Sequence, residues 1–598
     1  MKNLNRIFAF LLAFILLASL ALPATAAGET YSVTIDLADA GHTFDVYQIF
    51  VGDLTVTQKA DGGTTENVYT LSNIEWGESV SNSTTLLNAL KADTTEISYQ
   101  NVGVSDKTSL SAQIGEAATA ADVAAALEKL PATAKDRLMV RFAEIVGAAE
   151  KTGTTYTQKY LGDPVKTITY NNGYSASGLE PGYYLIKDRD GSQADNEGGF
   201  YTSYILHVVN NLTIQPKGSG VTLEKKISDK VGEGFSDEED FNIGDKAYYK
   251  LRGTLPSNLA DFDTYYYKFT DTLPAGISFE QIESIYVANK STEELVYTIM
   301  DLNDSNENNN SLPEGITVNK QKQGVVNETN TVTITFTNLK AHFNALSKDH
   351  VIIVKYSALV NRFAPTNDNL TNVAYLEYSN NPNVTGSGTP GSDDTGKTVE
   401  DYAHAFTYSL AVKKYEKDNE TNLLKDVEFV LYYTDEQNAK HYAKVVTASM
   451  IEAETQINDV SVTNNDLGVV YDWTTVKAEA STLITDENGS FTVRGLDAGT
   501  YYLEETKTNS GFNLLDSDVK VEINPTYSNT TTQNATVTVI YSVNDTAQGA
   551  SDVVEIPNAR GNVLPTTGGM GTTIFYAIGG ILVVCAIVIL ITKKRMAD

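Results

Sequence analysis

Apolar and polar residues alternate along most of the chain. The alternation is clear in YSVTIDL from Tyr31, in VTLEKKI from Val221 and in SLAVKKYE from Ser409. Residues i, i+2 and i+4 of a strand share one face, so this pattern predicts strands with one buried face. Tyrosine and threonine are abundant, which also favours strands. We expect a mainly β protein with tandem β-sandwich domains.

One stretch has helical spacing instead. Residues 117–151 are rich in alanine and place apolar side chains at Val123, Leu127, Leu130 and Leu138. Apolar residues three or four positions apart line one face of a helix. We expect a helical insertion that packs against a sheet in the first domain.

The N-terminus has the features of a secretory signal peptide. Lys2 and Arg6 give a positive start, the apolar stretch Phe8–Leu22 follows, and Ala24-Thr25-Ala26 offers small residues for cleavage. The exported chain is therefore expected to begin after residue 26.

A second apolar run, Ile574–Ile591, lies near the C-terminus and is followed by Lys593-Lys594-Arg595. The run is long enough to span a bilayer, and the basic cluster favours the cytoplasmic side. The single cysteine, Cys585, lies within this run, so no disulfide can form within the exported part. An exported multidomain chain without disulfides must be stabilised in another way.

Length and composition argue against several classes of function. The chain has 598 residues, a net charge of -32 and a pI of about 4.5. Such an acidic chain is not expected to bind nucleic acid, because phosphate binding needs basic patches. We find no phosphate loop, no metal-spaced His/Cys cluster and no nucleophile elbow, and therefore expect no enzyme of external substrates and no cofactor or metal. The oxygen-rich segment 301–310 lacks EF-hand spacing, and we expect it to be a solvated loop.

The chain divides into three regions of domain size between the signal peptide and the anchor. We expect a signal peptide at 1–26, domains at 27–216, 217–406 and 407–562, and a sorting and anchoring segment at 563–598. A short repeat links the first and third regions: GLEPGYYLIKD starts at Gly178, and GLDAGTYYLEET starts at Gly495. Both copies predict a turn followed by a Tyr-Tyr-Leu strand, so we expect the two regions to share a β-sandwich fold.

Six strands carry a polar residue on the face that the alternation predicts to be buried. Each of the second and third regions has a lysine near its start, an acid in its middle and an asparagine near its end. The six are Lys225, Asp271, Asn372, Lys414, Glu505 and Asn558. One such residue can sit at a strand end and reach water. The same order of the three residue types recurs in two regions, and this recurrence argues against coincidence.

These three residue types can react together. Burial disfavours the charged forms, which lowers the pKa of a lysine and raises that of a carboxyl group. A neutral amine is a nucleophile, and a neutral carboxylic acid can shuttle protons. Held close by the fold, the amine can attack the asparagine amide and expel ammonia, leaving a Lys–Asn isopeptide bond.

The motifs near the C-terminus resemble those of Gram-positive sortase-assembled major (backbone) pilins. TYYLEET resembles the E-box of that family, and VVEIPNARGNVLPTTGG resembles the end of its last domain followed by a sorting signal. The resemblance implies immunoglobulin-like domains of the collagen-adhesin type. It also implies isopeptide bonds Lys225–Asn372, with Asp271 as the acid, and Lys414–Asn558, with Glu505 as the acid. The neighbours Lys226 and Lys413 are alternatives that strand parity disfavours.

Two departures from the family pattern are visible. After the E-box, KTNSGF replaces the usual Ala-Pro-x-Gly-Tyr, which leaves the conformation of this loop open. In the first region, Lys187 stands where the third region has Glu505, so the acid is missing. We therefore expect no isopeptide bond in the first region.

The resemblance also implies a covalent polymer. A class C pilin sortase would cut the motif Leu564, Pro565, Thr566, Thr567, Gly568 after Thr567 and transfer the acyl chain to an amine. LTIQPKGSG, at the join of the first two regions, resembles a pilin motif with Gln215 and Gly218 in place of its tyrosine and asparagine. Lys217 is the expected acceptor.

The implied partners are other copies of the chain, the pilin sortase, accessory pilins, and a housekeeping sortase that joins the polymer to peptidoglycan. The implied location is the cell wall of a Gram-positive bacterium, where the pilus supports adhesion and colonisation. The adhesion receptor, on a host or a microbe, is left open. A monomeric wall-anchored adhesin and an ancillary tip or base pilin are the alternatives.

Overall fold

The computed structural model describes residues 29–596, with gaps at 38–40, 62–63, 102–103, 132–133, 153–154, 194–198, 216–219, 263, 303–310, 322–329, 344, 382–394, 458–459 and 562–570. The predicted signal peptide, the acceptor Lys217, the sorting motif Leu564–Gly568 and most of the predicted loop 301–310 therefore lie outside the described residues.

The chain forms two compact units. The first comprises residues up to Tyr408 together with Gly495–Ala498 and Pro525–Thr538. The second comprises Ser409–Arg494, Gly499–Asn524 and the remainder from Val539. Strands dominate both units, which agrees with the mainly β fold expected from the alternating pattern.

The N-terminal part of the first unit contains two sheets. The larger has the order β11-β10-β2-β3, with β8 also paired to β2, and its strands are β2 (Thr43–Asp61), β3 (Thr64–Trp76), β8 (Lys166–Thr169), β10 (Gly182–Asp188) and β11 (Ser203–Val208). The smaller has the order β12-β1-β9, formed by β1 (Tyr31–Ile35), β9 (Tyr174–Leu179) and β12 (Leu212–Ile214). Val33 and Ile35 from β1 and Phe44 and Val46 from β2 share one core.

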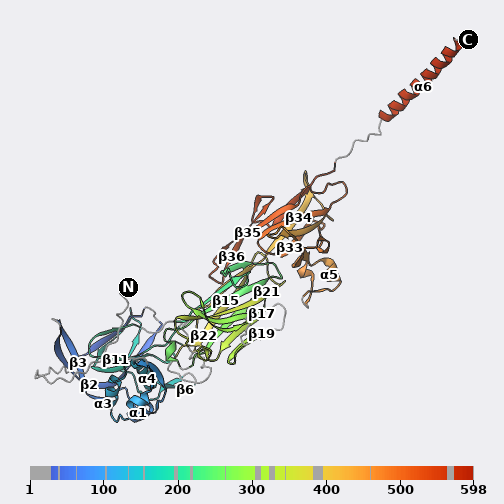
Figure 1. Ribbon diagram of the computed structural model, residues 1–598. Helices are drawn as coiled ribbons and strands as arrows, with labels where there is room; N and C mark the ends of the chain where they lie inside the picture. The colour runs from blue at the N-terminus through green and yellow to red at the C-terminus, as the bar shows by residue number, and fades with distance from the viewer. Residues whose placement is uncertain are drawn as a thin grey trace. The chain divides into compact units, whose positions relative to one another are not determined.

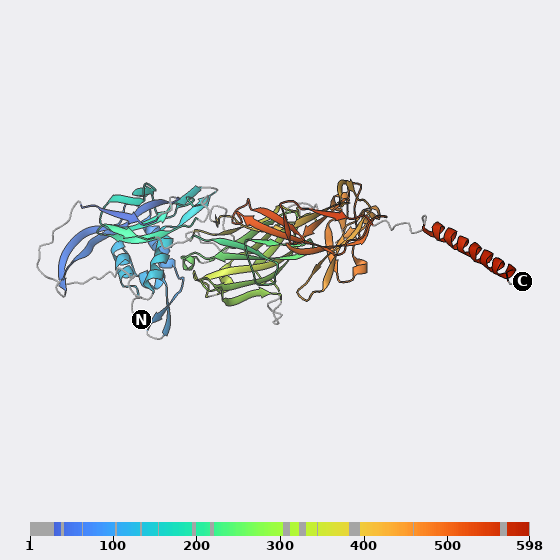
Figure 2. The same cartoon turned by 90° about the horizontal axis from the view of Figure 1, so that it is seen from above.

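Four helices cover one face of the larger sheet (Figures 1 and 2). They are α1 (Ser83–Ala92), α2 (Leu110–Ile114), α3 (Ala120–Glu128) and α4 (Lys135–Val146). A capping box starts α3, because Thr119 Oγ1 accepts from the Asp122 amide while the Asp122 carboxylate accepts from the Thr119 amide. Leu127 and Leu138 from these helices pack with Phe50 and Leu185 of the sheet.

Two hairpins accompany the helices: β4 (Ile97–Asn101) with β5 (Val104–Thr108), and β6 (Ala149–Thr152) with β7 (Thr155–Gln158). The helical prediction for 117–151 was correct for α3 and α4 and wrong at its end, where β6 begins. Pro131 accounts for the break between the two helices, because a residue before proline avoids the helical conformation.

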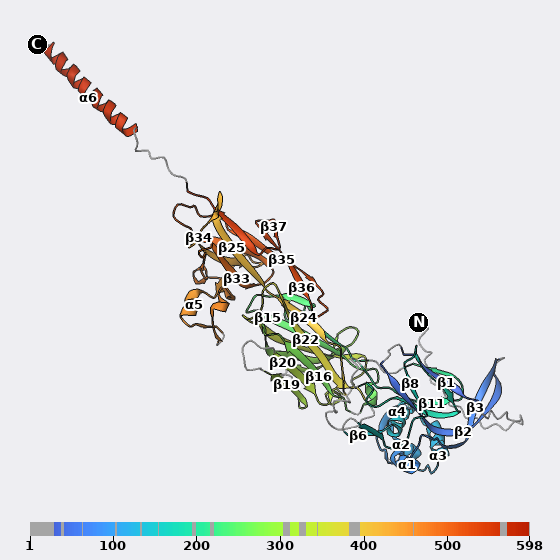
Figure 3. The same ribbon diagram turned by 180° about the vertical axis from the view of Figure 1, so that it is seen from behind.

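The middle region is a sandwich of two sheets. One has the order β13-β15-β21-β17-β18, from β13 (Leu223–Ser228), β15 (Lys246–Thr254), β17 (Ile277–Asn289), β18 (Leu295–Asp301) and β21 (His350–Val360). The other has the order β14-β24-β22-β16-β20-β19, with β23 beside β22 (Figure 3). Its strands are β14 (Glu238–Asp240), β16 (Tyr267–Leu273), β19 (Ile316–Gln321), β20 (Asn330–Phe336), β22 (Asn369–Ser379), β23 (Thr395–Lys397) and β24 (Asp401–Phe406). Short 3-10 turns lie at Leu259–Asp261 and Leu339–Ala341.

The last region also has two main sheets. The first joins β25 (Tyr408–Glu416) to β26 (Asn419–Leu423), β33 (Ser490–Leu496) and β38 (Val553–Asn558). The second has the order β31-β28-β27-β34-β35-β36-β37, with β32 beside β27. Its strands are β27 (Glu428–Thr434), β28 (Lys440–Val445), β31 (Val470–Thr474), β32 (Leu483–Ile484), β34 (Gly499–Lys507), β35 (Val519–Ser528), β36 (Thr536–Val543) and β37 (Thr546–Gly549).

Smaller elements complete this region: the helix α5 (Ala448–Glu452), the pair β29 (Gln456–Ile457) and β30 (Val460–Ser461), and 3-10 turns at Asn464–Asp466 and Lys477–Glu479. The C-terminal helix α6 (Gly571–Arg595) is apolar and exposed, and Ile574–Arg595 is long and apolar enough to cross a membrane. Its last turn carries Lys593, Lys594 and Arg595.

Candidate cross-linking sites

The first predicted trio lies in the core of the middle sandwich. Lys225 comes from β13 in one sheet, while Asp271 from β16 and Asn372 from β22 come from the facing sheet. All three side chains are fully buried. The Lys225 amine lies 2.6 Å from Asp271 Oδ2. The sandwich therefore brings the amine and the acid into direct contact.

A tyrosine connects this pair to the asparagine. The Tyr356 hydroxyl, from β21, donates to Asp271 Oδ2 at 2.8 Å. Its oxygen accepts from Asn372 Nδ2 at 2.8 Å and from Lys225 Nζ at 3.2 Å. Sequence reasoning missed Tyr356, because a buried tyrosine does not interrupt the apolar face of a strand. The Tyr356 hydroxyl thus hydrogen-bonds to all three predicted residues.

Two oxygens of this cluster have no hydrogen-bond partner among the described residues: Asp271 Oδ1 and Asn372 Oδ1. Buried polar atoms are nearly always paired, so two unpaired acceptors in one cluster need an explanation. One carboxyl oxygen of Asp271 and the amide oxygen of Asn372 therefore lie in the core without a donor among the described residues, while the other Asp271 oxygen contacts both Lys225 and Tyr356.

Burial also sets the charge of the amine. Desolvation lowers the pKa of Lys225, and the nearby Asp271 opposes this shift without cancelling it. The amine lies 4.7 Å from the centre of the Tyr249 ring and 5.5 Å from that of Tyr356. The pocket thus makes the neutral, nucleophilic form of the lysine easier to reach than it is in water.

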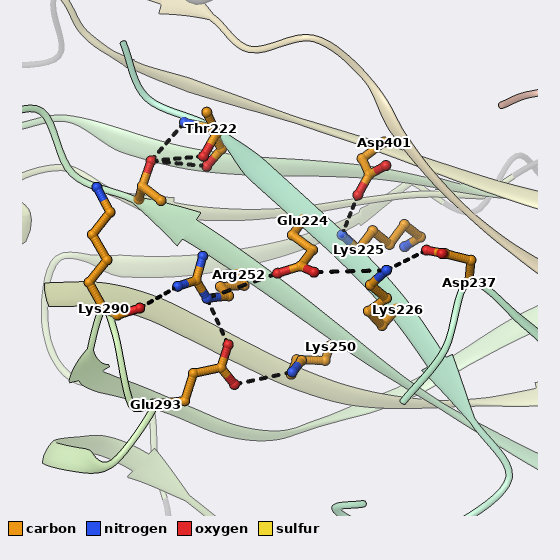
Figure 4. Close-up of polar contacts among 11 residues, drawn as sticks. Thr222, Glu224, Lys225, Lys226, Asp237, Lys250, Arg252, Lys290, Glu293 and Asp401 are labelled. Atoms are coloured by element: carbon orange, nitrogen blue, oxygen red, sulfur yellow. Dashed lines mark hydrogen bonds and ion pairs between the residues drawn. The ribbon is translucent and has the colours of Figure 1, made fainter. Parts of the chain in front are cut away.

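The neighbouring lysine points to the surface. Lys226 Nζ lies 2.6 Å from Asp237 and 3.8 Å from Glu224, in a partly exposed ion pair (Figure 4). The backbone amide of Lys225 donates to Asp401 Oδ2 at 2.6 Å (Figure 4). This contact fixes β13 against the start of β24.

The second predicted trio lies in the C-terminal region. Lys414 on β25 places its amine 2.6 Å from Asn558 Oδ1 on β38. The amide carbon of Asn558 is within about 3.8 Å of that amine, because a carbonyl bond is about 1.2 Å long. The neighbouring Lys413 instead pairs with Glu555 at 2.8 Å on the surface. Lys414 is therefore the lysine placed to react.

Glu505, which lies on the facing sheet, contacts both the amine and the amide. Its Oε1 lies 3.2 Å from Lys414 Nζ and accepts from Asn558 Nδ2 at 2.8 Å. Both ionisable side chains are almost wholly buried, at 0% exposure for Lys414 and 1% for Glu505. Burial lowers the pKa of Lys414 to about 8, although Glu505 opposes the shift. A useful fraction of this amine is neutral near physiological pH.

The loop that departs from the family pattern supports the site. Thr508 Oγ1 accepts from Asn558 Nδ2 at 2.7 Å, and the Leu515 amide donates to Glu505 Oε2 at 2.9 Å. The loop is tied to the end of β38 by backbone bonds from Asn513 to Ala559 and from Gly561 to Gly511. The KTNSGF sequence thus provides an ordered second acceptor for the asparagine amide.

The two sites differ in topology. In the middle region, the amine belongs to one sheet and the acid and amide to the other. In the C-terminal region, Lys414 and Asn558 lie on neighbouring parallel strands of one sheet, and only Glu505 comes from the facing sheet. Sequence reasoning treated the two trios alike, because residue order carries no information on strand pairing.

The first region also buries charged residues. Lys187 on β10 is 1% exposed, and its amine donates to Gly147 O and Asp190 Oδ2, each at 2.8 Å. The next residue, Asp188, is fully buried and lies 2.8 Å from His42 Nδ1. Burial raises the pKa of Asp188 to about 6. The first region therefore has acids close to Lys187, although none stands at the strand position that sequence reasoning examined.

Comparison with family models places one segment in a known domain family. Residues 408–537 match the SpaA model, described as a prealbumin-like fold domain. The segment begins at β25 and includes Lys414, Glu505 and Thr508. Comparison with curated protein sequences returns no match.

Several solved structures resemble the chain at low identity. The T6 backbone pilin of serotype M6 Streptococcus pyogenes has 14% identity and a TM-score of 0.46, covering 90% of this chain and all of that one. The major pilin SpaD of Corynebacterium diphtheriae has 14% identity and a TM-score of 0.42, with 89% and 97% covered. The major pilin RrgB of Streptococcus pneumoniae has 15% identity and a TM-score of 0.38, with 70% and 92% covered.

Proposed function

We propose that this chain is the major structural subunit of a covalent pilus on a Gram-positive cell surface. The observation that carries the proposal is the Lys414–Asn558 contact of 2.6 Å, buried beneath Glu505. A lysine, an acid and an asparagine packed this way suit a cross-linked domain that bears load. The sorting motif Leu564–Gly568 and the SpaA family match support the same function.

The proposed bond forms without an external catalyst. The neutral Lys414 amine attacks Asn558 Cγ, and the new Nζ–Cγ bond replaces the Cγ–Nδ2 bond. Glu505 takes a proton from the attacking nitrogen and delivers one to the leaving nitrogen, so that ammonia departs. Enforced proximity supplies much of the rate in such intramolecular reactions. In the middle region, Lys225, Asn372 and Asp271 fill the same roles, with Tyr356 bridging them.

Each cross-link would stabilise its domain strongly. Lys414 and Asn558 are 144 residues apart. The chain-entropy model for a covalent loop of that size gives about 5 kcal/mol of stabilisation. The exported part contains no cysteine, so these amide bonds would replace disulfides and could not be reduced. Pulling force would pass through the covalent bonds rather than separate the sheets.

Polymerisation would use the sorting motif of one subunit and the acceptor lysine of the next. A class C sortase would cleave after Thr567 and transfer its acyl group to Lys217 of the next subunit. The apolar helix α6 would hold the chain in the membrane until that cleavage. Accessory pilins, a housekeeping sortase and peptidoglycan would complete the assembly and its attachment to the wall.

Two alternatives share parts of this proposal. A monomeric wall-anchored adhesin would keep the cross-links and the sorting motif without using Lys217. An ancillary tip or base pilin would join the fibre at one place. The C-terminal site is compatible with all three roles. The behaviour of Lys217 separates the polymerising subunit from the monomeric adhesin, and the position of the subunit along the fibre separates it from an ancillary pilin.

The test compares surface extracts of cells that express wild type, Lys217→Ala or Lys348→Ala on a denaturing gel. Lys348 is an exposed lysine paired only with Asp349 and serves as the matched control. The proposal predicts a high-mass ladder for wild type and Lys348→Ala, and monomer for Lys217→Ala. A persistent ladder in Lys217→Ala would exclude this lysine, and no ladder in wild type would favour the monomeric adhesin. Immunolabelling along the whole fibre, rather than at one end, would exclude the ancillary role.

A further inference from the structure

A third cluster of amine, acid and amide lies in the N-terminal region. The Lys187 amine donates to Asp190 Oδ2 at 2.8 Å. The side-chain amide of Gln158, at the end of β7, donates to the same oxygen at 2.8 Å. The Lys187 and Gln158 nitrogens therefore lie within about 5.6 Å of each other.

This arrangement shares one feature with the C-terminal site. There, Glu505 Oε1 contacts both Lys414 Nζ, at 3.2 Å, and Asn558 Nδ2, at 2.8 Å. In both places one carboxylate oxygen lies between an amine and the nitrogen of a carboxamide. A group in this position can accept a proton from the amine and pass one to the departing nitrogen.

The N-terminal cluster also shares a feature with the middle site. Gln158 Oε1 and Asp190 Oδ1 are buried and have no hydrogen-bond partner among the described residues. Asp271 Oδ1 and Asn372 Oδ1 are unpaired in the same way. In each case one carboxyl oxygen is hydrogen-bonded, whereas the other carboxyl oxygen and the amide oxygen have no donor among the described residues.

The burial of Lys187 needs a reason beyond packing. Its side chain is 1% exposed and that of Asp190 is 3% exposed. A buried ion pair is weak evidence for stability, because the loss of hydration offsets much of the attraction. Condensation of this ion pair with the neutral carboxamide, with loss of ammonia, would leave an amide and a carboxylic acid and so remove both buried charges.

We propose that Lys187 and Gln158 form an isopeptide bond within the N-terminal region, with Asp190 transferring the proton. The Lys187 nitrogen attacks Gln158 Cδ, the Nζ–Cδ bond forms, and the Cδ–Nε2 bond breaks. Starting from the ion pair, the Lys187 ammonium gives up two protons: Asp190 keeps one and passes the other to the leaving nitrogen, and ammonia departs. No oxidant, metal or co-reactant is needed.

The bond would tie a peripheral hairpin to a central strand. Gln158 ends the β6–β7 hairpin that follows helix α4, and Lys187 lies on β10 between β2 and β11. The lysine amine also donates to Gly147 O, directly after α4. The cross-link would therefore fasten the helical insertion to the sheet that it covers, in a region where the sequence predicts no bond.

The test is tandem mass spectrometry of proteolytic peptides from wild-type protein released from cells. The expected product is the Lys187 and Gln158 peptides joined, with the loss of one ammonia. The joined pair is expected to persist in Gln113→Ala, whose amide contacts only Thr108, and to disappear in Gln158→Ala and Asp190→Asn. The wild-type measurement needs no variant, so it decides the proposal even if a variant fails to fold.

Linear peptides with unmodified Lys187 and Gln158 from folded wild-type protein would overturn the proposal. The Lys187–Asp190 contact would then be an ordinary buried ion pair. The Lys225–Asn372 and Lys414–Asn558 peptides are read in the same digest. The N-terminal bond can therefore fail while the proposed pilus function stands, and the two failures are distinguishable.

Discussion

Lys414 and Asn558 face each other from the first and last strands of the C-terminal region, with 2.6 Å between amine nitrogen and amide oxygen. The strands β25 and β38 run parallel, and their register pairs Glu416 with Asn558. A bond at this point would join the two ends of the region directly. A chain pulled from both ends would then transmit force through that bond while the sheets between stay folded.

Glu505 is expected to be essential for the C-terminal bond. Glu505→Gln keeps the shape of the side chain but cannot take up and return a proton. Proton transfer by a positioned side chain contributes about 10² to 10⁴ in rate. We expect peptide mapping of the variant to find free Lys414 and Asn558 and an intact Lys225–Asn372 bond. Glu504→Gln, on the opposite face of β34 and paired with Lys477, is the matched control and should cross-link normally.

Tyr356 is expected to accelerate the middle bond. Tyr356→Phe removes the hydroxyl that contacts Lys225, Asp271 and Asn372 but keeps the ring that fills the core. Loss of a buried hydrogen bond costs about 1–3 kcal/mol, so bond formation should slow by about ten- to a hundredfold. The measurement is the joined fraction of the Lys225–Asn372 peptides at intervals after synthesis.

The control for this prediction is Tyr267→Phe, which removes an equally buried hydroxyl that contacts only Thr254 O. Its middle bond should form at the wild-type rate. Equal rates in Tyr356→Phe and wild type would exclude Tyr356 from the reaction.

The C-terminal bond is expected to set the stability of its region. Glu505→Gln without the bond should lose about 5 kcal/mol of unfolding free energy relative to wild type, on the chain-entropy model. The C-terminal transition in denaturant unfolding measures this difference. Glu555→Gln breaks only the exposed pair with Lys413 and should change the free energy by less than about 1 kcal/mol. Equal stability of cross-linked wild type and Glu505→Gln would contradict the prediction.

A lysine left unbonded should make stability depend on pH. In Asn558→Ala, Lys414 stays free, with a folded pKa of about 8 against an unfolded value of 10.5. Between these values the unfolded chain binds more protons than the folded chain, so stability rises with pH. The rise should reach about 3 kcal/mol, from the size of the shift.

The reference for this measurement is the double variant Lys414→Met/Asn558→Ala, which lacks the amine. The difference between the two variants gives the contribution of Lys414 to the pH dependence of stability, separate from that of every other titrating group. Denaturant unfolding at a series of pH values gives both curves. Wild type should lack this contribution, because an amide nitrogen does not titrate. Parallel curves for the single and double variants would show that Lys414 is not perturbed by burial.

Strand periodicity was sufficient to single out both trios from the sequence. A lysine, acid or asparagine on an apolar face interrupts the alternation, and Lys225, Asp271 and Asn372 each lie on the buried face of their strands. The same parity places Lys226 and Lys413 on the outside, where both form surface ion pairs. These predictions depend on local pattern, which a sequence displays directly.

The supporting residues could not be predicted in this way. Tyr356 is compatible with an apolar face, and Thr508 lies in a loop beyond the end of its strand. Asp190 lies in the turn after β10 and Gln158 at a hairpin end, and only the fold brings Gln158 to the carboxylate that contacts Lys187. Such contacts depend on strand pairing and loop path, which the periodicity of one strand does not determine.

The most direct test of the cross-linked pilus is peptide mapping of purified wild-type fibres by tandem mass spectrometry. Beside the Lys187–Gln158 bond of the N-terminal region, the proposed function predicts three junctions in each internal subunit: Thr567 joined to Lys217 of its neighbour, Lys225 joined to Asn372, and Lys414 joined to Asn558. Each intramolecular junction should have lost one ammonia. Linear peptides carrying unmodified Lys414 and Asn558 throughout folded fibres would contradict the central claim.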